Sequence, residues 1–218
     1  MATEQSDAFV ERARQARIIA ILRAPTAEHV QSAAEALYEA GCRAIEVTMT
    51  TSGAVEAIAR LRKLLPADAW IGAGTVMTAD DVRAVTDAGA EYLISPVTDV
   101  QMIEEAQRQG VPAIPGALTP TEIVAAWRAG AAAVKVSPVS AVGGVDFVRQ
   151  VSAFLPGIPL VPTGGVELGD VQGYLAAGCP AVGLGAPLLK DALTAAGDLD
   201  ALRRRTREVL AGTGAAGA

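Results

Sequence analysis

Short runs of apolar and β-branched residues alternate with helix-forming stretches along the chain, and this alternation constrains the fold most. Eight runs have the composition of strands, and their starts are 21 to 27 residues apart, about the length of one strand plus one helix. The runs are 17–23, 43–48, 70–75, 91–95, 112–116, 133–137, 159–163 and 181–185. This pattern is typical of parallel strands joined by helices.

An Ala-Gly pair precedes four of the eight runs, at 40–41, 88–89, 129–130 and 177–178. Glycine after a helix provides a left-handed cap, so the repeat aligns the strands that follow. The side chains placed at one register are Glu46, Ile94, Lys135 and Gly183. In a (β/α)8 barrel, alternate strands contribute the four side chains of an interior layer. We therefore expect Glu46 and Lys135 to face the same interior.

The whole pattern predicts an α/β fold, a single-domain (β/α)8 TIM barrel over 1–210 with an N-terminal helix and a flexible Gly/Ala tail over 211–218. An open doubly wound sheet is the alternative, but eight units without a break fit a closed barrel better. Capping boxes mark three helix starts, each formed by a threonine and the residue three positions later. The pairs are Thr78 with Asp81, Thr98 with Gln101 and Thr119 with Glu122.

The composition indicates a cytoplasmic globular protein. Of its 218 residues, 51% are hydrophobic and 19% charged. The chain starts with a polar segment instead of a secretory leader, and its apolar runs are shorter than the roughly 18 residues of a membrane helix. The net charge of −6 argues against nucleic acid or an anionic membrane as partner. Cys42 and Cys179 lack disulfide or zinc spacing, and we expect them to be small buried residues.

Lys135 stands alone in the apolar run 129–138, where a packed strand should carry no charge. A buried ammonium is costly unless it is paired or deprotonated, and burial can lower a lysine pKa by roughly 3–5 units. One hypothesis is a strand-end lysine whose stem extends to water. The other is an unprotonated nucleophile.

Glu46, in the same predicted layer, also has two interpretations. The Lys135 and Glu46 pair could be a structural salt bridge, or an amine nucleophile with a proton carrier in a closed pocket. A position near the mouth of a barrel favours the catalytic interpretation. His29, the only histidine, lies on a predicted helix, so a Ser-His-Asp or Cys-His mechanism lacks its base. No cluster has metal-ligand spacing, which gives a metal route little support.

Two glycine-rich motifs, 162–166 (PTGGV) and 183–186 (GLGA), follow the seventh and eighth strands. Loops at these positions form a phosphate site in many barrels, where backbone N–H groups face the anion. A Gly-Gly pair alone is as readily a turn. The two motifs together, at these two strands, predict an anion site.

Seven motifs in this order, IIAILR, IEVTMTT, IGAGTV, YLISP, IPGALTPTE, VKVSP and VPTGGV, resemble the 2-keto-3-deoxy-6-phosphogluconate (KDPG) aldolase family with its related 4-hydroxy-2-oxoglutarate aldolases. The resemblance covers 17–189. It implies a class I aldolase on a (β/α)8 barrel that needs no metal or other cofactor, acts on a small 2-keto acid and is commonly a homotrimer. Lys135 matches the Schiff-base lysine, and Glu46 matches the general acid/base.

The same resemblance assigns the substrate site. Thr75 and Thr163 would contact the substrate carboxylate and hydroxyls, and Pro96 would shape the pocket. The positions that match the phosphate-binding backbone are Gly164, Gly165 and Gly185, followed by Ala186. Arg23, at the end of the first strand, is the candidate for the carboxylate, with a surface arginine as the alternative.

Three departures from the family pattern leave the substrate open. Thr50 replaces a common arginine, Ser137 a common phenylalanine, and Ala186 a serine that commonly donates a hydroxyl to phosphate. The first hypothesis is cleavage of KDPG to pyruvate and glyceraldehyde 3-phosphate. The second is 4-hydroxy-2-oxoglutarate or the galactonate epimer, which a weaker phosphate site would favour. A third, from another class, is a phosphosugar isomerase or synthase barrel, or a noncatalytic sugar-phosphate binder.

Overall fold

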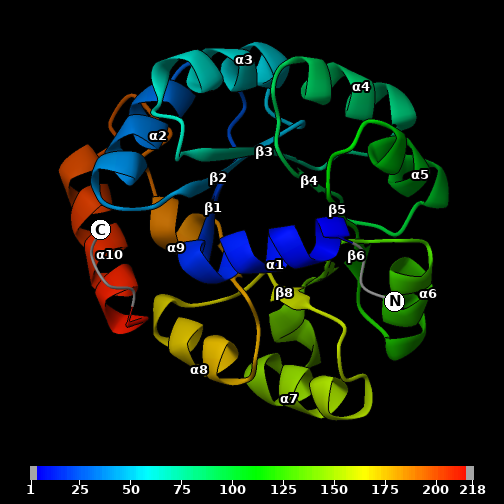
Figure 1. Ribbon diagram of the computed structural model, residues 1–218. Coiled ribbons are helices and arrows are strands. Elements are labelled where there is room, and N and C mark those ends of the chain that lie inside the picture. Colours follow the sequence, from blue (N-terminus) through cyan, green and yellow to red (C-terminus); the bar gives the residue numbers. More distant parts are fainter. Residues whose placement is uncertain (1–3, 215–218) are drawn as a thin grey trace.

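The computed structural model describes residues 4–214, in which helices surround a curled parallel sheet (Figure 1). The strands are β1 (Ile18–Leu22), β2 (Ala44–Thr48), β3 (Trp70–Gly74), β4 (Leu93–Ile94), β5 (Ala113–Ile114), β6 (Gly116–Ala117), β7 (Val134–Val136), β8 (Leu160–Pro162) and β9 (Val182–Leu184). The α-helices are α1 (Glu4–Ala16), α2 (Val30–Glu39), α3 (Ala54–Leu64), α4 (Ala79–Asp87), α5 (Val100–Arg108), α6 (Pro120–Arg128), α7 (Gly144–Phe154), α8 (Val171–Ala176), α9 (Ala186–Leu189) and α10 (Leu199–Gly212). Two 3-10 helices are η1 (Val139–Val142) and η2 (Leu168–Asp170).

The strands form two parallel sheets, one of six strands in the order β5-β4-β3-β2-β1-β9 and one of three in the order β6-β7-β8. Each predicted strand is present, and the predicted α/β class is confirmed. The fifth strand is split into β5 and β6 at Pro115, which has no backbone N–H to donate. The continuous eight-stranded sheet of the prediction is therefore interrupted, and the described chain shows a six-stranded half-barrel that is TIM-barrel-like.

Contacts outside the regular strand pairing join the two sheets on both sides. The Lys135 amide donates to the Pro115 carbonyl at 2.9 Å, so β7 is bonded to the point where β5 becomes β6. On the other side, Thr163 forms an isolated parallel bridge with Gly183. These contacts bring Lys135 and the loop after β8 to the same interior as β1 and β2.

Helix starts follow the predicted capping chemistry in two cases out of three. Thr78 with Asp81 and Thr119 with Glu122 form capping boxes. The third prediction is wrong, because Asp99 caps α5 by accepting from the Met102 amide at 2.8 Å. Thr98 instead donates its hydroxyl to the Gly116 carbonyl at 2.9 Å. A carboxylate accepts hydrogen bonds more strongly than a neutral hydroxyl, so the residue one position later takes the cap.

The C-terminal helix extends further than the sequence indicates. α10 continues to Gly212, two residues beyond the predicted boundary at 210. The rest of the predicted tail includes 215–218, which lie outside the described residues.

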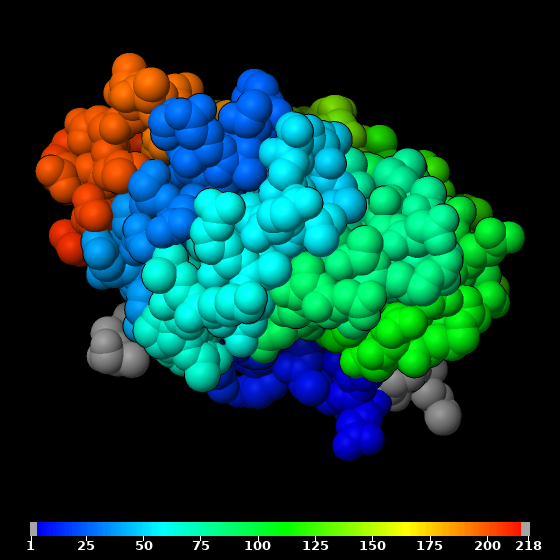
Figure 2. All heavy atoms as spheres, turned by 90° about the horizontal axis from the view of Figure 1, so that it is seen from above, coloured from blue at the N-terminus to red at the C-terminus, as the bar shows by residue number. Residues whose placement is uncertain are grey.

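α1 covers the amino-terminal ends of the strands (Figure 1). Phe9 packs against Trp70 with ring centroids 5.2 Å apart, and Trp70 packs against Tyr92 at 4.5 Å. The Ser6 hydroxyl donates to the Ala132 carbonyl at 2.7 Å. In Figure 2, α1 lies below, while the loop after β1 (blue) and the segment after β9 (orange) lie above. Because α1 covers the amino-terminal ends, the carboxyl ends of the strands are the accessible end of the curled sheet.

The structure also bears on the two cysteines and on membrane-spanning helices. Cys42 and Cys179 are free and buried, as predicted. Among residues 4–214, no helix has the length and apolar character needed to cross a membrane.

Candidate active site

A cavity of about 490 Å³ lies at the carboxyl ends of β1, β7, β8 and β9. Most of the predicted site residues line it, although they come from distant parts of the chain. These are Arg23, Lys135, Thr163, Gly164, Gly165, Gly185 and Ala186, with Ser137 beside them. The structure thus brings together the lysine, the arginine and both glycine-rich motifs around one space.

Lys135 lies at the centre of β7 and lines this cavity. The residue is 5% exposed, so its stem does not extend along the protein surface. None of the ion pairs among residues 4–214 includes Lys135. A buried amine that faces a cavity without a paired carboxylate is placed to react with a ligand.

Glu46, at the centre of β2, is 0% exposed. Within the described chain, neither of its carboxylate oxygens has a hydrogen-bond partner. Burial raises the pKa of Glu46, and the nearby charges of Lys135 and then Arg23 act in the opposite direction. The two side chains are thus electrostatically coupled without a direct ion pair. A buried carboxylate without partners is costly to the fold, so stability does not explain it.

Small residues make room for this carboxylate. A β-carbon at Gly74 would overlap the Glu46 carboxylate, and one at Gly72 would overlap the Tyr92 ring. The Tyr92 hydroxyl is also buried without a partner in the described chain, and burial raises its pKa further than the charge of Glu46 does. Tyr92 and Glu46 are therefore two buried polar side chains close enough for the charge of Glu46 to act on the tyrosine. Sequence patterns gave no signal for Tyr92, because an aromatic residue at a strand start is common in any core.

Arg23 and Thr75 lie together at the ends of β1 and β3. The Arg23 Nη2 atom donates to the Thr75 hydroxyl at 3.2 Å. Thr75 has a φ of 57°, in the left-handed region that a β-branched residue rarely adopts. Such strain often occurs at functional sites, where the surrounding structure holds it. Thr75 itself does not line the main cavity but is tied to it through Arg23.

Thr50, which stands where the family commonly has an arginine, belongs to a group of hydroxyls after β2. The Thr48 hydroxyl lies 3.1 Å from that of Thr50 and 3.3 Å from that of Thr51. Thr51 accepts from the Ala24 amide at 3.2 Å. These contacts hold the loop after β1, including Arg23, against the loop after β2.

Pro96 lies apart from the main cavity. It lines a neighbouring space of about 290 Å³, which shares Ser137 with the main cavity. A β-carbon at Gly116 would overlap the Pro96 carbonyl, so the strand end is packed closely against β6. Lys190 and Leu193 also line the main cavity, and no pattern in the sequence predicts this position for them. They follow β9 by one short helix, outside the strand-end positions that the repeat identifies.

Among residues 4–214, no group of three or more His, Cys, Asp or Glu side chains is arranged to hold a metal ion. The described site therefore offers an amine, a carboxylic acid, a guanidinium and backbone amides as its chemical groups.

Comparison with known proteins adds independent findings. A family model described as KDPG and KHG aldolase matches residues 9–205. A probable 2-dehydro-3-deoxy-6-phosphogalactonate aldolase of Rhizobium meliloti is 36% identical over 82% of this chain and 84% of its own. The KHG/KDPG aldolase of Escherichia coli K12 is 31% identical over 89% and 91%. The crystal structure of the Legionella pneumophila KDPG aldolase, with pyruvate captured as a covalent carbinolamine intermediate, has a TM-score of 0.84 at 27% identity and covers 92% of this chain and 97% of that one.

Proposed function

The chain belongs to the KDPG and KHG aldolase family and is a lyase, and from this premise we propose that it cleaves KDPG through a Schiff base at Lys135. The products are pyruvate and glyceraldehyde 3-phosphate. One observation carries the proposal: a buried lysine lines a cavity, and the charge it carries acts on a buried carboxylate that has no hydrogen-bond partner in the described chain. The pair supplies the nucleophile and the proton carrier that the reaction needs.

The reaction begins when Lys135, after passing its ammonium proton to solvent or to the Glu46 carboxylate, attacks the C2 carbonyl of the substrate as a neutral amine. Glu46, directly or through a water molecule, donates a proton to the hydroxyl of the resulting carbinolamine, which leaves as water. The product is a protonated imine, which can accept an electron pair, and Glu46 is left as a carboxylate. Glu46 removes the proton of the C4 hydroxyl, directly or through a water molecule. The C3–C4 bond breaks, its electrons form a pyruvate enamine, and glyceraldehyde 3-phosphate leaves.

The remaining steps return the enzyme to its starting state. The enamine takes a proton at C3 and becomes an imine again. Water hydrolyses this imine, which releases pyruvate and restores the Lys135 amine. Glu46 suits a role as a donor and acceptor of protons, because burial raises its pKa above the usual acidic range and so favours the protonated form between transfers.

The cavity supports a substrate with an anion at each end. Arg23, with Thr75 bonded to it, would bind the carboxylate. The loops that contain Gly164, Gly165 and Gly185 would offer backbone amides to the phosphate. Thr163, next to these glycines, would contact a substrate hydroxyl, and Ser137 would leave the wall beside Lys135 polar.

The galactonate epimer and 4-hydroxy-2-oxoglutarate are the alternative substrates. The name of the Rhizobium meliloti relative supports the first, and that of the Escherichia coli relative, KHG/KDPG aldolase, supports the second together with KDPG itself. Values of kcat/KM for KDPG, its epimer and 4-hydroxy-2-oxoglutarate decide between them. We expect KDPG to have the highest value, and a higher value for either competitor would replace it.

Borohydride trapping tests the Schiff base itself. The protein is mixed with pyruvate and reduced, and peptide mass analysis then shows which lysine carries the adduct. We expect the adduct on Lys135, its loss in Lys135→Met, and its retention in Lys63→Met, where an exposed lysine of α3 is removed. A wild-type protein without an adduct would overturn the imine mechanism and favour an isomerase, a synthase or a sugar-phosphate binder.

Two finer proposals concern architecture. The strands would close into a (β/α)8 barrel in which β5 and β6 count as one strand, a closure supported by the contacts at Pro115 and Thr163. The family resemblance further supports a homotrimer. Light scattering should then give about three times the chain mass of 22.2 kDa. A mass of one chain would overturn the trimer without affecting the chemistry.

A further inference from the structure

We propose that Lys190 binds the phosphate end of the substrate and sets the preference for phosphorylated over unphosphorylated keto acids. The inference rests on the proposed function and adds a residue to it. Three cationic side chains line the main cavity, namely Arg23, Lys135 and Lys190, whereas its lining contains no Asp or Glu. A site of this charge in a chain of net charge −6 is suited to a multiply charged anion.

The three cations have different positions in the sheet. Lys135 is used by the imine chemistry, which places its nitrogen at C2 of the substrate and away from the phosphate end. Arg23 follows β1 and reaches across the end of β2 to Thr75 after β3, where it donates a hydrogen bond at 3.2 Å. Its charge is therefore drawn towards the β3 side of the site.

Lys190 follows β9, which pairs with the other edge of β1. The loop after β8 lies on this side, because Thr163 bridges to Gly183 of β9. Gly164 and Gly165 of that loop line the same cavity as Lys190. Lys190 is therefore the cation on the side of the glycine-rich loops, and a substrate that spans the cavity would meet Arg23 at one end and Lys190 at the other.

The backbone at Lys190 is held in an uncommon conformation. Its φ is 47° and its ψ is −116°, and its amide donates to the Ala186 carbonyl at 2.8 Å. Among residues 4–214, only Arg17, Thr75 and Lys190 combine a positive φ with a side chain larger than that of glycine. Glycine would adopt this conformation without strain. The presence of a lysine here therefore points to a function for its side chain.

The Lys190 side chain is available to a ligand. The residue is exposed, and none of the ion pairs in the described part of the chain includes it. A lysine ammonium binds phosphate as a compact charge on a flexible stem, which suits a position at the rim of a cavity. Ala186, which also lines the cavity, has no hydroxyl to offer, so a side-chain contact to phosphate must come from elsewhere.

The test compares KDPG with its unphosphorylated counterpart, 2-keto-3-deoxygluconate, in steady-state cleavage. Lys190→Met should lower kcat/KM for KDPG by about five- to tenfold, the size expected of one exposed charged contact. The value for the unphosphorylated substrate should stay within a factor of about two, since that substrate never uses the contact. Lys190→Arg should keep most of the preference. Lys63→Met removes the same charge from α3 and is the matched control, which should leave both values unchanged.

The outcomes separate this inference from the proposed function. If Lys190→Met keeps the wild-type preference, or lowers kcat/KM equally for both substrates, Lys190 does not recognise phosphate and the aldolase mechanism stands. If the wild type forms the pyruvate adduct but has no preference for phosphate, both KDPG and the role of Lys190 are wrong. If no adduct forms at all, the failure lies in the proposed function.

Discussion

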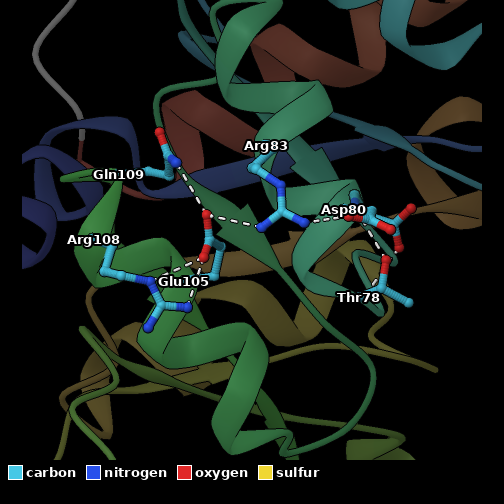
Figure 3. A network of polar contacts seen from close by, with 7 residues as sticks. Thr78, Asp80, Arg83, Glu105, Arg108 and Gln109 are labelled. Carbon is cyan, nitrogen blue, oxygen red and sulfur yellow. Dashed lines mark hydrogen bonds and ion pairs between the residues drawn. The ribbon is translucent and has the colours of Figure 1, made fainter.

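Two buried glutamates of this protein differ in whether their carboxylates have hydrogen-bond partners. Glu46 lies in the barrel interior, without a hydrogen-bond partner in the described chain. Glu105, on α5, has a side chain 7% exposed and lies among partners from two neighbouring helices (Figure 3). It accepts from Gln109 at 3.0 Å and from Arg108 at 2.6 Å, and it pairs with Arg83 of α4 at 3.2 Å.

This difference in hydrogen-bond partners shifts the pKa values of the two glutamates in opposite directions. Hydrogen bonds from Gln109 and Arg108, and then from Arg83, lower the pKa of Glu105 to about 2. Burial without such partners raises the pKa of Glu46. A satisfied carboxylate stays ionised and holds two helices together, whereas an unsatisfied one can exchange a proton. Glu105 therefore stabilises the fold, whereas Glu46 is held in place at a cost in stability.

The largest expected effect is on turnover in Glu46→Gln. The amide keeps the shape of the side chain but cannot carry the proton, so kcat should fall by about 10²- to 10⁴-fold. The free energy of unfolding at neutral pH should stay the same or rise, because a buried carboxylate without partners is removed. Steady-state kinetics and urea denaturation measure the two effects.

Glu105→Gln is the matched control for this variant, since it makes the same chemical change in the other glutamate. It should keep kcat within a factor of about two, as expected for a site far from the chemistry. Near-normal turnover in Glu46→Gln would remove Glu46 from proton transfer. Equal losses of turnover in both variants would show that the difference in environment between Glu46 and Glu105 does not give Glu46 a separate role in catalysis.

A second test moves Glu46 without changing it. In Gly74→Ala, the new β-carbon would overlap the Glu46 carboxylate and force it to shift. A displacement of this kind can lower kcat by about 10²-fold. Gly169→Ala is the control, because a β-carbon there has no neighbour within 4 Å. Continued trapping of pyruvate on Lys135 would show that the barrel is intact, and unchanged turnover with an intact barrel would argue against a precise position for Glu46.

The positions of the strands, and of Glu46 and Lys135 on them, could be predicted from the sequence. Strand periodicity and the Ala-Gly repeat depend on local chemistry, and they predict that Glu46 and Lys135 face one interior. Thr98 shows where local rules failed, because two neighbouring residues could both cap α5 and a tertiary contact with Gly116 decided between them.

Pro96 and Lys190 show a second kind of failure. Pro96 has the predicted register but faces a neighbouring space, since β6 packs closely against its carbonyl. Lys190 reaches the cavity through an unusual backbone conformation after a helix of four residues, α9. Positions that depend on such turns have no periodicity from which they could be predicted.

The third effect is on stability and should be smaller. Glu105→Gln removes the charge that joins α4 to α5, so the midpoint of thermal unfolding at neutral pH should fall by a few degrees. Asp146→Asn removes the carboxylate of an exposed pair with Arg149 and is the control, which should hardly move the midpoint. An unchanged midpoint in Glu105→Gln would mean that its three partners form a network without consequence for stability.

The smallest effect is the pH dependence of stability, in which the two glutamates should act with opposite sign. The pKa of Glu105 in the folded state, about 2, lies below the ordinary value of 4.5, so its stabilisation is present above pH 4.5 and is lost as the pH falls towards 2. The pKa of Glu46 lies above 4.5, so the folded state holds this proton more tightly, and stability decreases as the pH rises from 4.5 through the folded pKa. Glu105→Gln should therefore flatten the acid side of a plot of urea midpoint against pH, and Glu46→Gln should flatten the side above pH 4.5. If Glu46→Gln left that side unchanged, the carboxylate would titrate alike in the folded and unfolded chains, and its isolation in the barrel would not control its proton.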